Sequence, residues 1–295
     1  MREKTKTRAK PRELETVITP GPEHWVGDGF HVRTVFSPFA DAQKLSPFLL
    51  LDHANPKYFS PASRRRGVGE HPHRGFETVT FAYRGEVEHR DSTGAGGRIG
   101  PGDVQWMTAA SGVVHEEMHS QRFTEAGGEF EMVQLWVNLP AVDKMSPPRY
   151  QPLLAPEFPR LSLGAAEARL VAGRLGSQLG PAKTHTPMTV FDLSFFENGI
   201  SEMELPNSWT VLACVLEGQV EAVDGGSIEP RHVGVFKRDG EGTVLLRGSK
   251  GARVLMLSGQ PLNEPVVAYG PFVMNTREEI ATAFRDYQSG KMGHL

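Results

Sequence analysis

The chain has 295 residues, a net charge of −3 and an isoelectric point of about 6.4, so no excess of basic residues indicates direct nucleic-acid binding. Its only cysteine, Cys214, excludes a disulfide within the chain. No apolar run approaches the roughly 18–20 residues that a membrane span needs, and no apolar segment of a secretory signal follows the basic residues 1–13. We therefore expect a cytoplasmic protein of about two domains with a solvated N-terminal tail.

Short strands separated by turns are predicted from Thr16 to Leu51, because residues 31–36 alternate between apolar and polar and residues 48–53 form a short apolar run. Residues 54–70 have the composition of a loop. This loop carries three consecutive arginines, which form either a positive rim for an anionic substrate or, more commonly, an exposed charge run: Arg64, Arg65 and Arg66.

Two histidines stand one residue apart in the sequence HPHRGFETVTF, which begins at His71 and places the second at His73. Side chains two positions apart on a strand point to the same face. About forty residues later, His115 and Glu117 repeat this spacing. If the two strands lie side by side, three imidazoles and one carboxylate converge, a donor set that suits a divalent first-row transition metal and leaves coordination positions open.

Further strands are predicted at residues 76–83 and 85–91, as a pair that turns at Arg84–Gly85, and at residues 129–140. Residues 141–160 are rich in proline, and this is the one clear shift in composition along the chain. We therefore predict an N-terminal metal-binding domain of residues 1–145 and a C-terminal domain of residues 146–295.

The second half repeats the first in weakened form, because residues 204–218 align with residues 71–85 and both segments end in glycine after an apolar run. The alignment places four residues at the positions of the predicted ligands, and none of the original ligand types survives: Glu204, Pro206, Leu245 and Arg247. The sequence therefore predicts a second unit of the same fold without a metal site.

A helix is predicted near residues 276–290. Thr276 and Glu279 form a capping box, and Gly290 is a natural stop. Its apolar face, expected to pack across the outside of a sheet, has the spacing i, i+3, i+4, i+7: Ile280, Ala283, Phe284 and Tyr287.

Four motifs, HPHRGFETVTF, GDVQWMTAASGVVHEEM, QLWVNLP and EPVVAYGPFVMNTREEI, together resemble the pirin family of bicupins, and the resemblance runs from about Val32 to Gly293. It implies an all-β fold of two cupin (jelly-roll) β-barrels in tandem, followed by a short C-terminal helix. It also implies a single iron, Fe(II), in the N-terminal barrel, although another divalent transition metal fits the same donors. The resemblance carries the four ligands onto His71, His73, His115 and Glu117.

Glu77 offers a second candidate carboxylate, since the general cupin pattern would make it a ligand and it has the strand parity of His73. The pirin pattern uses Glu117, so we expect Glu77 to orient a histidine from outside the ligand set. Three other histidines have no such same-face partner, and we expect them at the surface or behind the ligands: His89, His119 and His185.

Two classes of function follow from the resemblance. The first is an iron-dependent dioxygenase of the quercetin 2,3-dioxygenase type, acting on a flavonol and O2, with Glu117 as ligand and as the base that takes the hydroxyl proton. The second is a metal- or redox-responsive regulatory protein that acts through protein partners, as transcription cofactors do. Both classes use the same site residues, and the acidic balance favours the enzyme slightly.

Overall fold

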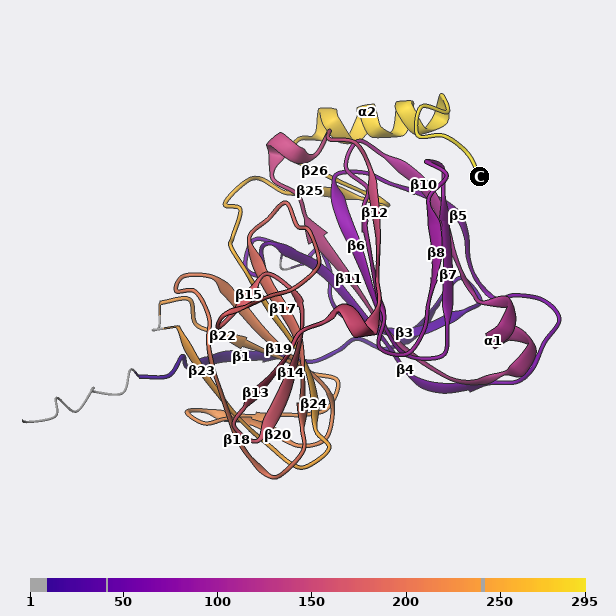
Figure 1. Ribbon diagram of the computed structural model, residues 1–295. Helices are drawn as coiled ribbons and strands as arrows, with labels where there is room; N and C mark the ends of the chain where they lie inside the picture. The colour runs from indigo at the N-terminus through magenta and orange to yellow at the C-terminus, as the bar shows by residue number, and fades with distance from the viewer. Residues whose placement is uncertain (1–9, 41, 240–241) are drawn as a thin grey trace, which may run out of the picture. The chain divides into compact units, whose positions relative to one another are not determined.

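Strands make up most of the chain in a computed structural model that describes residues 10–40, 42–239 and 242–295 (Figure 1). The chain divides into two compact units. We call Pro20–Phe158, Pro181–Pro187 and Pro261–Leu295 barrel A, and we call Met1–Thr19, Pro159–Gly180 and Met188–Gln260 barrel B.

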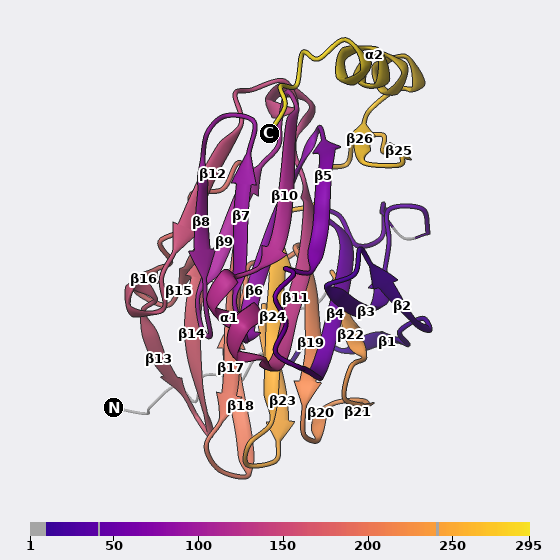
Figure 2. The ribbon, with the colours of Figure 1, turned by 90° about the vertical axis from the view of Figure 1, so that its right-hand side faces the viewer.

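Barrel A contains two large antiparallel sheets and a separate antiparallel hairpin, β25-β26. The seven-stranded sheet has the order β12-β9-β6-β11-β4-β3-β2, and the four-stranded sheet has the order β5-β10-β7-β8, which Figure 2 shows with its strands side by side. The predicted hairpin at Arg84–Gly85 is wrong, because the strands on its two sides belong to different sheets. The strands are β2 (Glu23–Val26), β3 (Phe30–Phe36), β4 (Phe48–Phe59), β5 (Gly67–His73), β6 (Phe76–Arg84), β7 (Val87–Asp91), β8 (Gly96–Ile99), β9 (Val104–Thr108), β10 (Val113–His119), β11 (Gly128–Asn138), β12 (Arg149–Leu153), β25 (Val267–Tyr269) and β26 (Phe272–Met274).

Barrel B repeats this plan. Its two large sheets have the orders β1-β22-β19-β24-β17-β14-β13 and β18-β23-β20-β21. A separate small hairpin, β15-β16, falls between β14 and β17 in the chain. Its interior is a continuous apolar core. The strands are β1 (Leu14–Ile18), β13 (Arg160–Leu163), β14 (Ala166–Ala172), β15 (Arg174–Leu175), β16 (Gln178–Leu179), β17 (Met188–Phe195), β18 (Gly199–Glu204), β19 (Thr210–Glu217), β20 (Val220–Ala222), β21 (Gly226–Ile228), β22 (Val233–Phe236), β23 (Thr243–Gly248) and β24 (Arg253–Gly259).

The matching strand orders support the internal repeat, since β18-β23-β20-β21 corresponds strand by strand to β5-β10-β7-β8. Two antiparallel sheets packed around one interior form a jelly roll. The predicted all-β fold of two jelly-roll barrels is therefore confirmed.

The division between the barrels differs from the predicted boundary at residues 145 and 146. β12, which lies beyond that boundary, pairs with β9 of barrel A, and β1, near the N-terminus, pairs with β22 of barrel B. Residues 261–295 also belong to barrel A. The prolines of residues 141–160 lie before β12, within it and in or beside the short 3₁₀ helix η2 (Ala155–Glu157), and another short 3₁₀ helix, η1 (Ala141–Asp143), precedes them. Composition alone does not reveal which sheet an edge strand joins.

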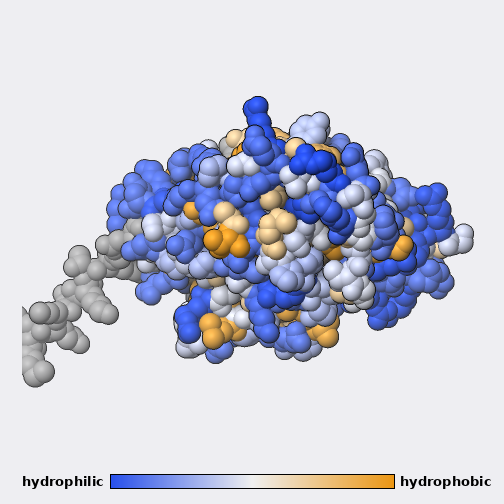
Figure 3. All heavy atoms as spheres, turned by 90° about the horizontal axis from the view of Figure 1, so that it is seen from above, coloured by the Kyte–Doolittle hydropathy of each residue, from blue (hydrophilic) through white to orange (hydrophobic). Residues whose placement is uncertain are grey.

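The predicted helix is α2 (Arg277–Gln288), and its capping box is formed by Thr276 and Glu279. Ile280 and Ala283 are buried in a cluster with Val114, which lies on β10, so the helix packs on the outside of a sheet as expected. Its other side is exposed and polar, in keeping with the mostly hydrophilic face in Figure 3.

A second helix, α1 (Gln121–Ala126), is not predicted from the sequence; it begins after Ser120, whose side chain accepts a hydrogen bond from the Phe123 amide. Six residues are too few to display helical periodicity. Neither helix in the described part of the chain has the length and apolar character needed to cross a bilayer.

Candidate metal centre

The pairing of β5 with β10 creates the site. His71 and His115 are direct partners across these antiparallel strands, and a shift of register follows between His115 and Glu117. The imidazole centroids lie 4.2 Å apart for His71 and His115, 4.8 Å for His71 and His73, and 4.9 Å for His73 and His115. The structure therefore brings the three predicted histidines together on one face.

Hydrogen bonds set the orientation of the first two rings. The Nδ1 atom of His71 lies 2.8 Å from the Gly69 carbonyl, and that of His73 lies 3.3 Å from the Pro271 carbonyl. A carbonyl only accepts, so Nδ1 carries the proton in each ring, and Nε2 of the neutral imidazole keeps its lone pair. One nitrogen of each of the three histidines lies within 4.8 Å of those of the other two. Metal-bound histidines in proteins are commonly held in this way.

His115 provides the test of whether a metal fits this site. It is completely buried, yet its Nε2 atom has no hydrogen-bond partner within the described residues. A buried polar atom without a partner costs about 1–3 kcal/mol, and a metal ion shared with His71 and His73 would satisfy it. Burial, and then the neighbouring histidines, lower the pKa of both His73 and His115 well below 6.5, so both rings are neutral and able to coordinate at pH 7.

Glu117 lies on the same face of β10 and is buried. Its Oε1 atom accepts hydrogen bonds from the Gln105 amide and, at 3.2 Å, from the Thr80 hydroxyl. The ligand atoms of Glu117 group with those of His89 and His115, within 4.8 Å of one another, rather than with His71 and His73. His115 therefore links the three-histidine cluster to the carboxylate.

The sequence predicts His89 at the surface or behind the ligands without a same-face partner, and the structure places it behind His115 with Asp91 as its partner. His89 is buried on β7 and contacts His115, with 3.2 Å between the two Nδ1 atoms. Its Nε2 atom lies 3.0 Å from Oδ2 of Asp91. The residues VEHRD, with His89 and Asp91 two apart, carry the same-face spacing that identified His71 and His73, so the signal was present in the sequence.

Residues near the C-terminus hold the end of β5. Arg74 follows His73 directly, and its guanidinium donates to the Ser111 carbonyl at 2.7 Å and to Asp286 on α2 at 2.9 Å. Gly75 adopts a φ of +89°, and a Cβ atom there would lie 1.9 Å from the Val273 carbonyl oxygen. These contacts fix the turn that positions His73, and nothing in the local sequence around it reveals them.

Glu77 does not orient a histidine. It lies three residues from Thr80, which contacts Glu117, and strand side chains an odd number of positions apart face opposite sides. Its Oε1 atom accepts a hydrogen bond of 2.7 Å from Thr108 on the neighbouring strand. The turn at Arg74–Gly75 breaks the parity on which the prediction relied. Burial raises the pKa of Glu77 to about 7, and the hydrogen bond from Thr108 offsets this only in part.

Replacing Glu77 by glutamine is therefore expected to stabilise the metal-free protein at pH 8 but not at pH 5. An acid whose pKa rises from 4.5 to about 7 on folding stabilises fully below pH 4.5 and loses that contribution as pH rises through 7. At pH 8 the buried charge costs up to about 3 kcal/mol. Urea unfolding at both pH values measures the difference.

The matched control is Glu204→Gln, because Glu204 is exposed and its replacement should not alter the pH dependence. Metal content should be equal in Glu77→Gln and wild type, since the carboxylate faces away from the histidines. A loss of metal in Glu77→Gln would instead indicate that Glu77 is a metal ligand, as the general cupin pattern predicts.

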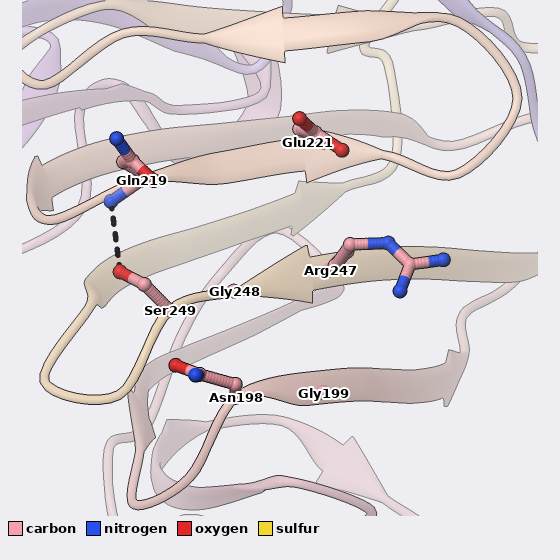
Figure 4. Close-up of a pocket in the computed structure, with 7 residues that line it drawn as sticks. All are labelled: Asn198, Gly199, Gln219, Glu221, Arg247, Gly248 and Ser249. Carbon is pink, nitrogen blue, oxygen red and sulfur yellow. Dashed lines mark hydrogen bonds between the residues drawn. The ribbon is translucent and has the colours of Figure 1, made fainter.

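In barrel B, the alignment of ligand positions is shifted by one residue. The inward side chains of β23 are Val244 and Leu246, whereas Arg247 is exposed. Their partners on β18 are Met203 and Ser201. An open pocket of about 320 Å³ lies on the solvent-exposed face of these strands, and Figure 4 shows the backbone amide of Gln219 donating a hydrogen bond to the Ser249 hydroxyl at its edge. It is lined by Asn198, Gly199, Gln219, Glu221, Arg247, Gly248 and Ser249.

The remaining candidates lie apart from the three-histidine cluster. His119 is buried among phenylalanines, and its Nε2 lies 3.0 Å from the Gly29 carbonyl. His185 is partly exposed, 3.4 Å from Asp143. Arg64 and Arg65 pair with acidic side chains, and Arg66 lies over the Phe59 ring. Each arginine of the run therefore has a partner within barrel A.

Comparison with known proteins identifies the family. The sequence profile of the Pirin family matches residues 29–137, and that of the Pirin C-terminal cupin domain matches residues 190–293. A Pseudomonas aeruginosa protein that carries the provisional name of a quercetin 2,3-dioxygenase is 54% identical over 270 residues, which cover 91% of this chain and 94% of that protein. Human pirin is 34% identical over 257 residues, covering 86% of this chain and 85% of pirin.

Among solved structures, the crystal structure of a quercetin 2,3-dioxygenase from Acinetobacter baumannii has a TM-score of 0.93 and 47% sequence identity, and the match covers 96% of this chain and 99% of that one. The fold, both family profiles and these relatives agree. The chain therefore belongs to the pirin family of bicupin proteins.

Proposed function

We propose that this protein is an iron-dependent dioxygenase that acts on flavonols, of the quercetin 2,3-dioxygenase type, with one Fe(II) held by His71, His73, His115 and Glu117. The single observation that carries the metal site is the unpartnered, buried Nε2 atom of His115 beside two further imidazoles whose Nδ1 atoms are already engaged. The names of the Pseudomonas and Acinetobacter relatives support the choice of reaction.

When bound, iron would supply the Lewis acidity that lets a flavonol hydroxyl ionise and the electron density that makes the flavonolate reactive toward O2. The residues of the chain have complementary tasks. Three neutral imidazoles add no charge to the site, so Glu117 is the anionic donor. The Gln105 amide and the Thr80 hydroxyl hold Oε1 of Glu117, which orients the carboxylate to accept the substrate proton.

The location of His71 is suited to substrate entry. His73 and His115 are buried, whereas His71 is partly exposed. The site is therefore accessible from solvent on the His71 side. Trp136 and Phe76 lie next to His73, with ring centroids 5.3 and 5.1 Å from its imidazole, so aromatic side chains border the cluster beside His73.

Iron-loaded protein is expected to consume O2 when quercetin is added, with uptake in proportion to the iron content of the sample. An oxygen electrode measures the rate, and the loss of flavonol absorbance gives the stoichiometry. The control substrate is a flavone without the 3-hydroxyl group, which offers no acidic hydroxyl at that position and should give no uptake. If fully loaded protein consumes no O2 with any flavonol, the enzymatic proposal fails and the regulatory class is favoured.

A further inference from the structure

A line of three side chains runs from the metal site into the barrel. Oδ2 of Asp91 lies 3.0 Å from Nε2 of His89, and Nδ1 of His89 lies 3.2 Å from Nδ1 of His115. All three residues are buried. The end of the line at the metal site is the unpartnered Nε2 atom of His115.

The chemistry of the donors fixes the protons along this line. A carboxylate only accepts, so His89 donates its Nε2 proton to Asp91. A neutral His89 ring that donates from Nε2 has its lone pair at Nδ1 and accepts there. Nδ1 of His115 is the donor, and Nε2 of His115 is left as a bare lone pair directed away from His89. This is the only tautomer of His115 in which Nε2 can coordinate a metal.

The surroundings hold the line in place. The Tyr150 ring stacks on His89, with centroids 4.5 Å apart and planes inclined by 3°. The other carboxylate oxygen of Asp91, Oδ1, accepts hydrogen bonds from the Thr93 amide at 2.9 Å, from the Thr93 hydroxyl at 2.6 Å and from the Ala95 amide at 3.3 Å. Each oxygen of Asp91 therefore has a separate task, one toward the turn and one toward His89.

We propose that His89 and Asp91 are positioning residues of the metal centre, which hold His115 in its metal-binding tautomer without contacting the metal. The proposal rests on the metal site of the proposed function but not on its substrate. His89, His115 and Glu117 also lie close enough together to resemble a second metal site. In this proposal they are not one, because the Nδ1 atom of His89 accepts the His115 proton and does not serve as a ligand.

Asp91→Asn is the decisive variant. Asparagine can keep its oxygen toward Thr93 and Ala95 while it presents an NH₂ group to His89. His89 must then accept at Nε2 and carry its proton on Nδ1. That proton faces the Nδ1 proton of His115, and the repulsion favours the tautomer of His115 that is protonated at Nε2. Loss of such a partner typically weakens metal binding 10–100-fold, and we expect that rise in Kd in chelator competition with Co²⁺. The visible spectrum of bound Co²⁺ should change as well.

Thr93→Val is the matched control, since it removes a hydrogen bond from the same turn but from the other oxygen of Asp91. Its Kd for Co²⁺ should equal that of wild type. An equal Kd in Asp91→Asn and wild type would overturn the proposal. Saturation with two Co²⁺ ions per chain would overturn it too, because His89 would then be a ligand.

The tautomers can be read without any metal. In the metal-free wild type, ¹⁵N NMR of the imidazoles should show His115 protonated at Nδ1 and His89 at Nε2, and Asp91→Asn should reverse both. His115 protonated at Nε2 in wild type would refute the proposal even if the variant does not fold. Neither measurement involves a flavonol, so a failure here is distinct from a failure of the dioxygenase proposal.

Discussion

Replacing His71 and His115 together by alanine is expected to reduce the metal content from about one transition-metal ion per chain to none. The two residues are direct partners across β5 and β10, so the double change removes one donor from each strand. The remaining His73 and Glu117 do not group with each other in the structure. Elemental analysis of protein produced in iron-rich medium gives the result.

The control for this experiment is His185→Ala, which removes a partly exposed imidazole from the same barrel and should leave the metal content unchanged. Full occupancy in the double variant would mean that the metal lies elsewhere. If the wild-type protein made in iron-rich medium contained no metal, the proposed metal centre itself would be contradicted.

Glu117→Gln is expected to slow turnover far more than it lowers metal content. Glutamine keeps the shape and one oxygen that can act as a donor to the metal. It loses the negative charge and the ability to take a proton. If Glu117 is the base, turnover falls by about 10²–10⁴-fold at equal metal loading. The oxygen-electrode rate, divided by the iron content of each sample, measures the effect.

The matched comparison is Thr80→Val, which removes one hydrogen bond to the same carboxylate and keeps its charge. This variant should retain most of its activity per iron. A Glu117→Gln protein whose activity falls only in proportion to its iron would assign the carboxylate a ligand role alone. The assignment of the proton acceptor would then move to another group.

Period-two spacing was sufficient to find the histidine cluster, because His71 and His73 share a face whichever strand lies beside them. The same spacing joins His89 to Asp91, but the contact of His89 with His115 follows only from the pairing of β7 with β10, which places His89 opposite Glu117. The local sequence of a strand does not determine which distant strand pairs with it. The same reasoning was wrong for Glu77, because a positive φ at Gly75 reverses the alternation before β6 begins.

The fold was predicted more fully than the boundary between its halves. Turn residues and short apolar runs are local signals, so they predicted strands well, and the capping box at Thr276 predicted α2. Edge strands are different, because β1 and β12 join sheets on the opposite side of the expected boundary. Only the hydrogen bonds of the folded sheets show to which sheet an edge strand belongs. The one-residue error in the alignment at Arg247 arose in the same way, because the register between strands also depends on these hydrogen bonds.

The interleaved path of the chain has a consequence for the order in which the protein matures on the ribosome. Residues 188–260, most of barrel B, are synthesised before residues 261–295, which belong to barrel A. The Pro271 carbonyl that orients His73 and the Asp286 carboxylate that holds Arg74 therefore emerge only after the apolar barrel is complete. A nascent chain carries all four proposed ligands long before it can hold them rigidly, so tight binding of the proposed metal would be a late event that follows translation.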